Sequence, residues 1–223
     1  MIFKENIFEK VCVNDMYKSQ MQDSFSDKTM PEFCPLSISS TLKDEYKKDG
    51  FEKEYIDSYL KAAKILADDA MKTCHPTNNR GILMVFSKNN VTIPMLYMVR
   101  HTLELSIKYA IECIGGNPKD VHGLIKLWNS FYSYLPKNIS GKDRSFLKKM
   151  YEFLESINSL DATGTKLRYS EDENGYTQGD FMWINPRDIV DNAEKFIKQL
   201  YLLDIEKVKC RKQNDTKVGD END

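Results

Sequence analysis

The chain has 223 residues, of which 41% are hydrophobic and 30% charged, an ordinary composition for a globular protein with one core. Its 32 basic and 34 acidic residues leave a net charge of −2, which argues against the bulk attraction that histone-like nucleic-acid binders use. Five scattered cysteines, none in a Cys-x-x-Cys pair, indicate neither a disulfide framework nor a zinc site. No apolar run approaches the ~20 residues of a membrane span, and the first residues include acids where a signal peptide is apolar. We therefore expect a cytoplasmic protein without a membrane span.

The first part of the chain changes from irregular to strongly helical patterning. Residues 1–40 carry little sustained periodicity and are expected to form an irregular N-terminal extension. From Glu54 to Cys74 apolar residues recur at helical spacing without glycine or proline, which predicts a helix that Pro76 cannot continue. The apolar run at 82–86 is short and fits either a buried turn of helix or a strand.

The stretch from Thr92 to Gly116 is the most regular part of the sequence. Thr92 is expected to cap a long helix, Pro94 suits its first turn, and Gly115 and Gly116 end it. At about 100° per residue one side of this helix is apolar, with Leu96, Val99, Leu103, Ile107, Ala110, Ile111 and Ile114. The other side is polar, with Arg100, His101, Glu104, Lys108 and Glu112.

The polar side of this helix has two interpretations. Its charges alternate in sign at i,i+4, a pattern that is common on solvated helices. Such a ladder does not require His101, and a histidine beside an arginine, a carboxylate and a lysine supplies groups suited to proton transfer and phosphate binding. A cleft that Arg100 and His101 share with His122 or Arg168 would favour a functional site. An isolated position on a convex surface would favour the ladder.

Two more helices follow. A helix over 121–135 would place His122 in its first turn, where the macrodipole disfavours the imidazolium and keeps the ring neutral. His122 equally fits a structural residue that packs beside Trp128. The next helix is expected from Asp143 to Leu160, and the basic residues near its start suit either a phosphate backbone or solvent.

The helical period disappears between residues 161 and 184. Two runs of aromatic and branched residues bracket a loop that contains an Asn-Gly pair, which predicts a small β-hairpin near 166–184. Arg168 stands in this hairpin. Its guanidinium either pairs with a core carboxylate such as Asp161 or presents a fork to a phosphate.

The last helix is expected to open at Asn185 and Pro186 and to run to about Lys209, before a polar tail over 210–223 that we expect to be disordered. Together the elements predict a mainly α domain over 41–209, most simply an up-and-down helical bundle with a β-hairpin insertion. The sequence contains no Walker loop, Gly-x-Gly-x-x-Gly, Gly-x-Ser-x-Gly, His-Glu-x-x-His or EF-hand loop. The common nucleotide-binding, hydrolase and metalloprotease classes are therefore not indicated.

Three short motifs resemble a known family. RHTLELSIKYAI at 100–111, HGLIKLW at 122–128 and the downstream LRY at 167–169 are similar in order and spacing to bacterial helical proteins of the HEPN superfamily (higher eukaryotes and prokaryotes nucleotide-binding). The resemblance covers roughly Tyr55 to Tyr201. It implies an α-helical bundle, a homodimer, and a metal-independent endoribonuclease or an RNA- or nucleotide-binding component of a bacterial phage-defence or toxin–antitoxin system. It implies no cofactor.

The resemblance also implies the site residues. The superfamily signature is an arginine followed by a polar residue and then a histidine; Arg100 and His101 match its start, whereas positions 104–107 hold no histidine. Either His101 or His122 does that work by a different geometry, or the chain binds RNA without cutting it. No metal ligand is expected. The candidates are Arg100, His101, Glu104 and His122 for catalysis, and Lys108, Arg168 and Tyr169 for substrate binding.

Two functions from different classes therefore stay open. Cleavage of RNA without a metal needs a base for the 2′-hydroxyl, an acid for the leaving 5′-oxygen and cations on the phosphate. A two-fold dimer would bring two copies of these groups into a composite cleft. The alternative is a non-catalytic helical dimer that acts as an antitoxin, an adaptor with a cognate protein partner, or a nucleotide sensor.

Overall fold

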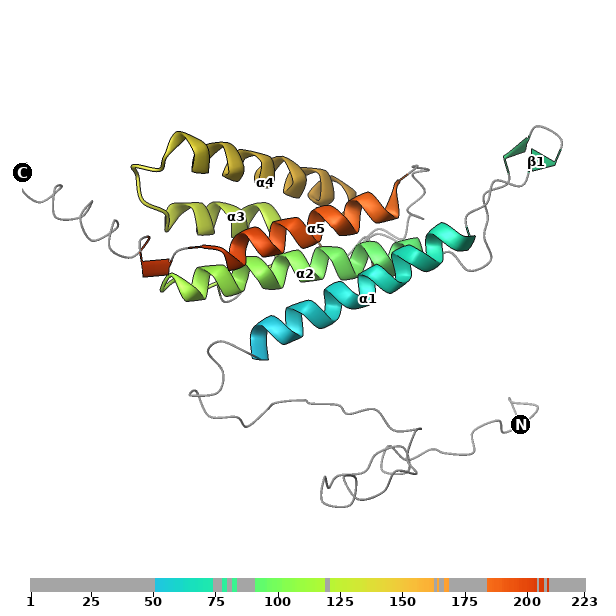
Figure 1. Cartoon of the computed structure of the whole chain (residues 1–223), viewed down its shortest axis with the longest axis horizontal. Helices are drawn as coiled ribbons and strands as arrows, with labels where there is room; N and C mark the ends of the chain where they lie inside the picture. Colours follow the sequence, from blue (N-terminus) through green and yellow to red (C-terminus); the bar gives the residue numbers. More distant parts are fainter. Residues whose placement is uncertain are drawn as a thin grey trace, which may run out of the picture. The chain divides into compact units, whose positions relative to one another are not determined.

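Helices account for most of the chain that the computed structural model describes, namely residues 51–73, 78–79, 82–83, 91–118, 121–162, 164, 167–168, 184–203, 205–206 and 208. The helices are α1 (Phe51–Thr73), α2 (Thr92–Cys113), α3 (Leu124–Ser133), α4 (Gly141–Leu160) and α5 (Pro186–Tyr201). Two short strands, β1 (Asn78–Asn79) and β2 (Ile82–Leu83), pair antiparallel. The prediction of a mainly α-helical fold is confirmed, and the helices pack against one another (Figure 1).

Helix α2 lies at the centre of the bundle, in contact with α1, α3 and α5. Every residue of its predicted apolar side is buried. Burial extends well beyond that side, because Met95, Thr102, Ser106 and Tyr109 are buried too. A helix that is covered on several sides buries polar positions as well, so its polar side cannot be read as solvent-facing.

The start of α2 differs from the prediction by one residue. The first intrahelical bond runs from Met95 N to Val91 O (3.0 Å), which makes Val91 the N-cap residue. Thr92 is thus the first helical residue and not the cap. Pro94 lies in the first turn as predicted, where its missing N–H leaves no helical bond unmade.

The end of α2 is confirmed. Gly115 has a φ of 85°, a conformation that suits glycine. The N–H of Gly115 donates to Glu112 O (3.0 Å), and the N–H of Gly116 donates to Ile111 O (2.8 Å). This pair of bonds is a Schellman motif, which satisfies carbonyls that the helix would otherwise leave unpaired.

Helix α3 runs in the same direction as α2, so the predicted up-and-down order is wrong at this step. The residue before its N-cap, His122, contacts Arg100 near the middle of α2, whereas Tyr134, which follows α3, lies beside Gly116 at the end of α2. Figure 1 shows the two helices side by side with the same sense. Short connections favour antiparallel neighbours, whereas the segment between Cys113 and Leu124 is long enough to return the chain along α2.

Helices α4 and α5 begin at side-chain caps. Ser140 Oγ accepts from Asp143 N (3.1 Å), and Asn185 Oδ1 accepts from Asp188 N (3.3 Å). The predicted opening of the last helix at Asn185 is confirmed. Helix α5 ends at Tyr201, earlier than the expected end near residue 209.

Several predicted features lie outside the described residues. Of the expected hairpin near 166–184, only 167–168 and residue 184 are described, and 167–168 form a turn. The extension at 1–40 and the tail at 210–223 also lie outside. No helix in the described part of the chain is long and apolar enough to cross a membrane.

Candidate functional site

A cluster of charged groups surrounds the guanidinium of Arg100 on α2. Nη1 donates to Glu104 Oε2 (3.3 Å), Nη2 donates to His122 O (3.1 Å), and Nε donates to Asp161 O (3.2 Å). Each of its three nitrogens therefore has an acceptor within the protein. Arg100 is only 4% exposed. It joins the middle of α2 to the residues before α3 and after α4.

The segment after α4 is shaped around this arginine. The carboxylate of Asp161, which is buried, lies 3.8 Å from Arg100 Nε and accepts from Gly164 N (2.7 Å) and Leu167 N (3.4 Å). Gly164 has a φ of 80° and packs against the guanidinium so closely that a Cβ there would lie 2.8 Å from its atoms. Only glycine fits this position without displacement.

Glu104 connects the buried arginine to groups nearer the surface. Its Oε1 accepts from Lys108 Nζ (2.9 Å) and lies 3.0 Å from His122 Nδ1. Burial alone would raise the pKa of Glu104, but the hydrogen bonds from Lys108 and His122 and the charge of Arg100 more than offset this effect, so the pKa lies below its usual value. Glu104 is therefore ionised at neutral pH.

His122 is the accessible member of the cluster. Its side chain is 73% exposed while Nδ1 is held by the Glu104 carboxylate. The tautomer with a proton on Nδ1 donates to that carboxylate and leaves Nε2 as a proton acceptor. The expected position in the first turn of a helix is wrong, because α3 begins at Leu124 with Gly123 as its N-cap. The charged group in contact with this ring is the Glu104 carboxylate.

His101 is half-buried among aromatic rings on α1 and α2. Its ring lies edge-on to Tyr59, with 4.7 Å between the centroids, and is stacked with Tyr97 at 5.9 Å. Burial lowers the pKa of His101, and the positive charges of Lys108 and Arg100 add to this against the opposing effect of Glu104. The neutral imidazole is therefore favoured at neutral pH.

The predicted substrate-binding residues have different outcomes. Lys108 is half-buried and bound to Glu104. Arg168 Nε donates to Gly164 O (2.6 Å), and Gly164 packs against the Arg100 guanidinium. The carboxylate of Asp161, the expected partner of Arg168, lies 3.8 Å from Arg100 Nε. Tyr169 lies outside the described residues.

The structure partly distinguishes the two interpretations of the polar side of α2. A fully solvated ladder is wrong, because Arg100 and Glu104 are buried. The structure brings Arg100, Glu104, Lys108 and His122 together, and Gly164 links Arg168 to the same cluster. Among the residues described, no group of three or more His, Cys, Asp or Glu side chains could hold a metal ion.

The sequence did not identify Asp161 and Gly164 as partners of Arg100, because their contacts cross about sixty residues of chain. A local signal was available for the aromatic neighbours of His101. Tyr97, His101, Glu104 and Lys108 follow at spacings of four, three and four residues, which places them along one face of α2.

No family model, curated protein or solved structure matches this chain.

Proposed function

We propose that this protein is an HEPN-like, metal-independent endoribonuclease of a bacterial phage-defence or toxin–antitoxin system. One observation carries the proposal: an exposed imidazole, that of His122, has one ring nitrogen held by an ionised carboxylate, that of Glu104. This pairing fixes the ring and leaves the other nitrogen for proton transfer. The resemblance of the motifs around Arg100 and His122 to the HEPN superfamily supplies the substrate class.

In this mechanism His122 accepts the proton of a ribose 2′-hydroxyl. The 2′-oxygen forms a bond to phosphorus, the bond from phosphorus to the 5′-oxygen breaks, and the leaving oxygen takes a proton from an acid. Glu104 stabilises the imidazolium that forms on His122. Lys108 places a positive charge beside the same carboxylate, where it can act on the phosphate.

Arg100 acts as a positioning residue in this scheme. Its guanidinium bonds to the backbone of His122 and to the carboxylate of Glu104, the two groups whose relative position defines the pair. The general acid comes from a second copy of the chain, because the described part of one chain presents one exposed histidine of the cluster, and a two-fold dimer presents two.

The test is incubation of the purified protein with total RNA, with and without EDTA, for wild type and His122→Ala. We expect cleavage in EDTA and a loss of about 10²–10⁴-fold in rate for His122→Ala. Lys195→Ala, which removes an exposed cation from α5, is the surface control and should cut like wild type. Absence of cleavage by the wild type, or normal cleavage by His122→Ala, would exclude the mechanism.

A non-catalytic helical dimer that acts as an antitoxin, an adaptor or a nucleotide sensor is the second candidate. It is favoured by the observation that the nitrogens of Arg100 all bond within the chain, as in a structural network. Light scattering should give twice the 26.0 kDa chain mass in either case. A dimer that leaves RNA intact in every condition would support this second function.

A further inference from the structure

Four rings on α1 and α2 form a cluster that we call the aromatic cluster: Tyr55, Tyr59, Tyr97 and His101. The rings of Tyr55 and Tyr59 lie edge-on at 5.2 Å between centroids, and their hydroxyls are 3.4 Å apart. Tyr59 and Tyr97 both contact the ring of His101. The cluster therefore crosses from one helix to the other without a break.

This cluster reaches the surface. Tyr55 is 47% exposed, and Tyr59, Tyr97 and His101 are half-buried. Aromatic rings that serve only the core are more completely covered, as Phe131 on α3 is. An accessible set of rings held at fixed angles offers π-faces to a flat ligand.

The aromatic cluster also adjoins the charged cluster. Tyr97 and His101 lie on the same face of α2 as Glu104 and Lys108. The charges of Lys108, Arg100 and Arg168, together with the opposing charge of Glu104, act on the imidazole of His101, so the inner end of the aromatic cluster lies near the charged cluster. Aromatic rings next to positive charge are the usual components of sites for single-stranded nucleic acid.

We propose that the aromatic cluster is a stacking platform for the unpaired bases of single-stranded RNA, with Tyr55 and Tyr97 as its principal rings. This proposal rests on the proposed function, which supplies RNA as the substrate. It adds that the unpaired bases are held, and that they are held on these rings. The neutral His101 supports the Tyr97 ring, while Lys108 faces the phosphates that lead towards His122. Stacking of this kind tolerates any base sequence, because every base has a π-face.

The binding assay uses the full-length His122→Ala protein, so that RNA stays intact whether or not the wild type cuts it. Fluorescence anisotropy with a labelled oligouridylate measures the affinity. Adding Tyr55→Ala or Tyr97→Leu should weaken binding roughly five- to 150-fold. Adding Tyr97→Phe, which keeps the ring and removes only the hydroxyl, should leave the affinity within about twofold.

The matched control is Tyr132→Ala, which removes a tyrosine of similar exposure, 43%, from α3 outside the aromatic cluster. It should leave affinity unchanged. Loss of a ring should also leave the salt dependence of binding unchanged, because no phosphate contact is removed. Thermal unfolding, monitored by circular dichroism, identifies any variant that fails to fold. If Tyr97→Leu fails to fold, the affinity of Tyr55→Ala, at an exposed position, decides the test.

Equal affinity for Tyr55→Ala, Tyr97→Leu and Tyr132→Ala would overturn the platform, as would tighter binding to duplex RNA than to the single strand. These outcomes are separate from the failure of the proposed function. A wild-type protein that never cuts RNA but binds it through the tyrosines would retain the platform and lose the catalytic scheme.

Discussion

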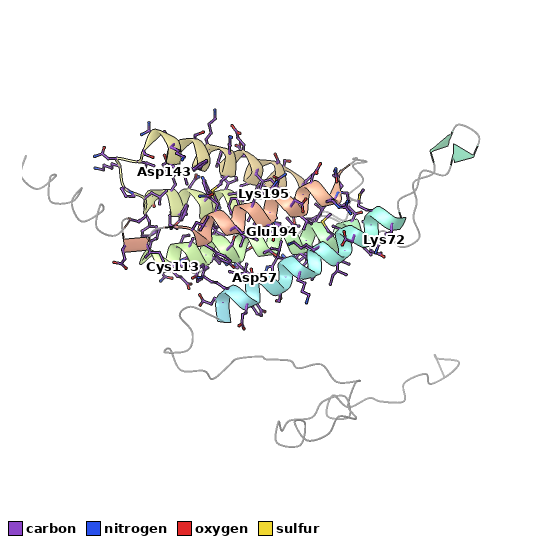
Figure 2. All side chains as sticks on the ribbon, in the orientation of Figure 1. Asp57, Lys72, Cys113, Asp143, Glu194 and Lys195 are labelled. Carbon is purple, nitrogen blue, oxygen red and sulfur yellow. The ribbon has the colours of Figure 1, made fainter. Side chains whose placement is uncertain are left out.

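Two carboxylates in this bundle, Glu104 on α2 and Glu194 on α5, each pair with a lysine at i+4 and with a second cation. Glu194 Oε1 accepts from Lys64 Nζ at 2.8 Å and from Lys198 Nζ at 2.9 Å, and Figure 2 labels it on α5. Glu104 likewise has a lysine at i+4, at 2.9 Å. The distances to the i+4 lysines do not distinguish the two ion-pair clusters.

Their surroundings differ. The Glu104 side chain is 8% exposed and that of Glu194 is 27% exposed. The lysines on Glu194 extend into solvent, whereas the Arg100 that bonds to Glu104 is buried. Since solvent screens exposed pairs and the interior does not, the same contacts contribute different free energies, and only the buried cluster can set the position of other groups.

The largest expected effect is that of Arg100→Met. It removes the cation shared by the buried carboxylates of Glu104 and Asp161, and breaking a buried ion pair in this way costs about 3–5 kcal/mol. Chemical denaturation should show this loss in the free energy of unfolding. Lys64→Met at the exposed cluster is the control and should cost under about 1 kcal/mol. Equal costs at the two clusters would contradict the distinction.

The buried cluster also shows where sequence reasoning stops. The apolar side of α2 and its stop at Gly115 followed from periodicity and turn chemistry, which are local. The burial of Arg100 did not, because it depends on the segments before α3 and after α4, which are distant in sequence and contact its guanidinium. A charge ladder at i,i+4 has the same sequence on a solvated helix and on a central one.

The site shows the same limit. The sequence identified Arg100, Glu104, Lys108 and His122 as candidates, and the structure places them together. It offered Asp161 as a partner of Arg168 and did not identify the contact of Asp161 with Arg100. That contact depends on the backbone after α4, where residue 164, with a φ of 80°, brings the chain against Arg100.

Gly164→Ala should have the next largest effect. It combines the cost of a non-glycine residue at positive φ with a contact to the Arg100 guanidinium that the buried arginine cannot relieve. Gly115→Ala is the matched control, because φ is 85° there and nothing lies within 4 Å of the new Cβ. We expect about 1–2 kcal/mol for Gly115→Ala and about 2–4 kcal/mol for Gly164→Ala from denaturation curves. Equal costs at the two positions would show that backbone strain alone governs both.

The smallest effect is expected for Glu194→Gln, and its dependence on salt and pH is more informative than its size. Hydrogen bonds from Lys64 and Lys198 lower the pKa of Glu194, so its contribution is fully present above the ordinary value of 4.5 and is lost as the pH falls through the lowered pKa. At neutral pH the substitution should cost under about 1 kcal/mol, and this cost should fade in about 1 M salt.

The pKa of Glu104 is lowered too, so the free-energy cost of Glu104→Gln should also decrease as the pH falls, as it does for Glu194→Gln. Added salt should not decrease the cost of Glu104→Gln, because the pairs of Glu104 with Arg100 and Lys108 are largely shielded from solvent ions. Unfolding curves of both variants across a salt series therefore separate the two clusters where pH alone does not. A cost at Glu104 that fades with salt as fast as the cost at Glu194 would place both carboxylates at the surface and would remove the physical basis for a fixed Glu104–His122 pair.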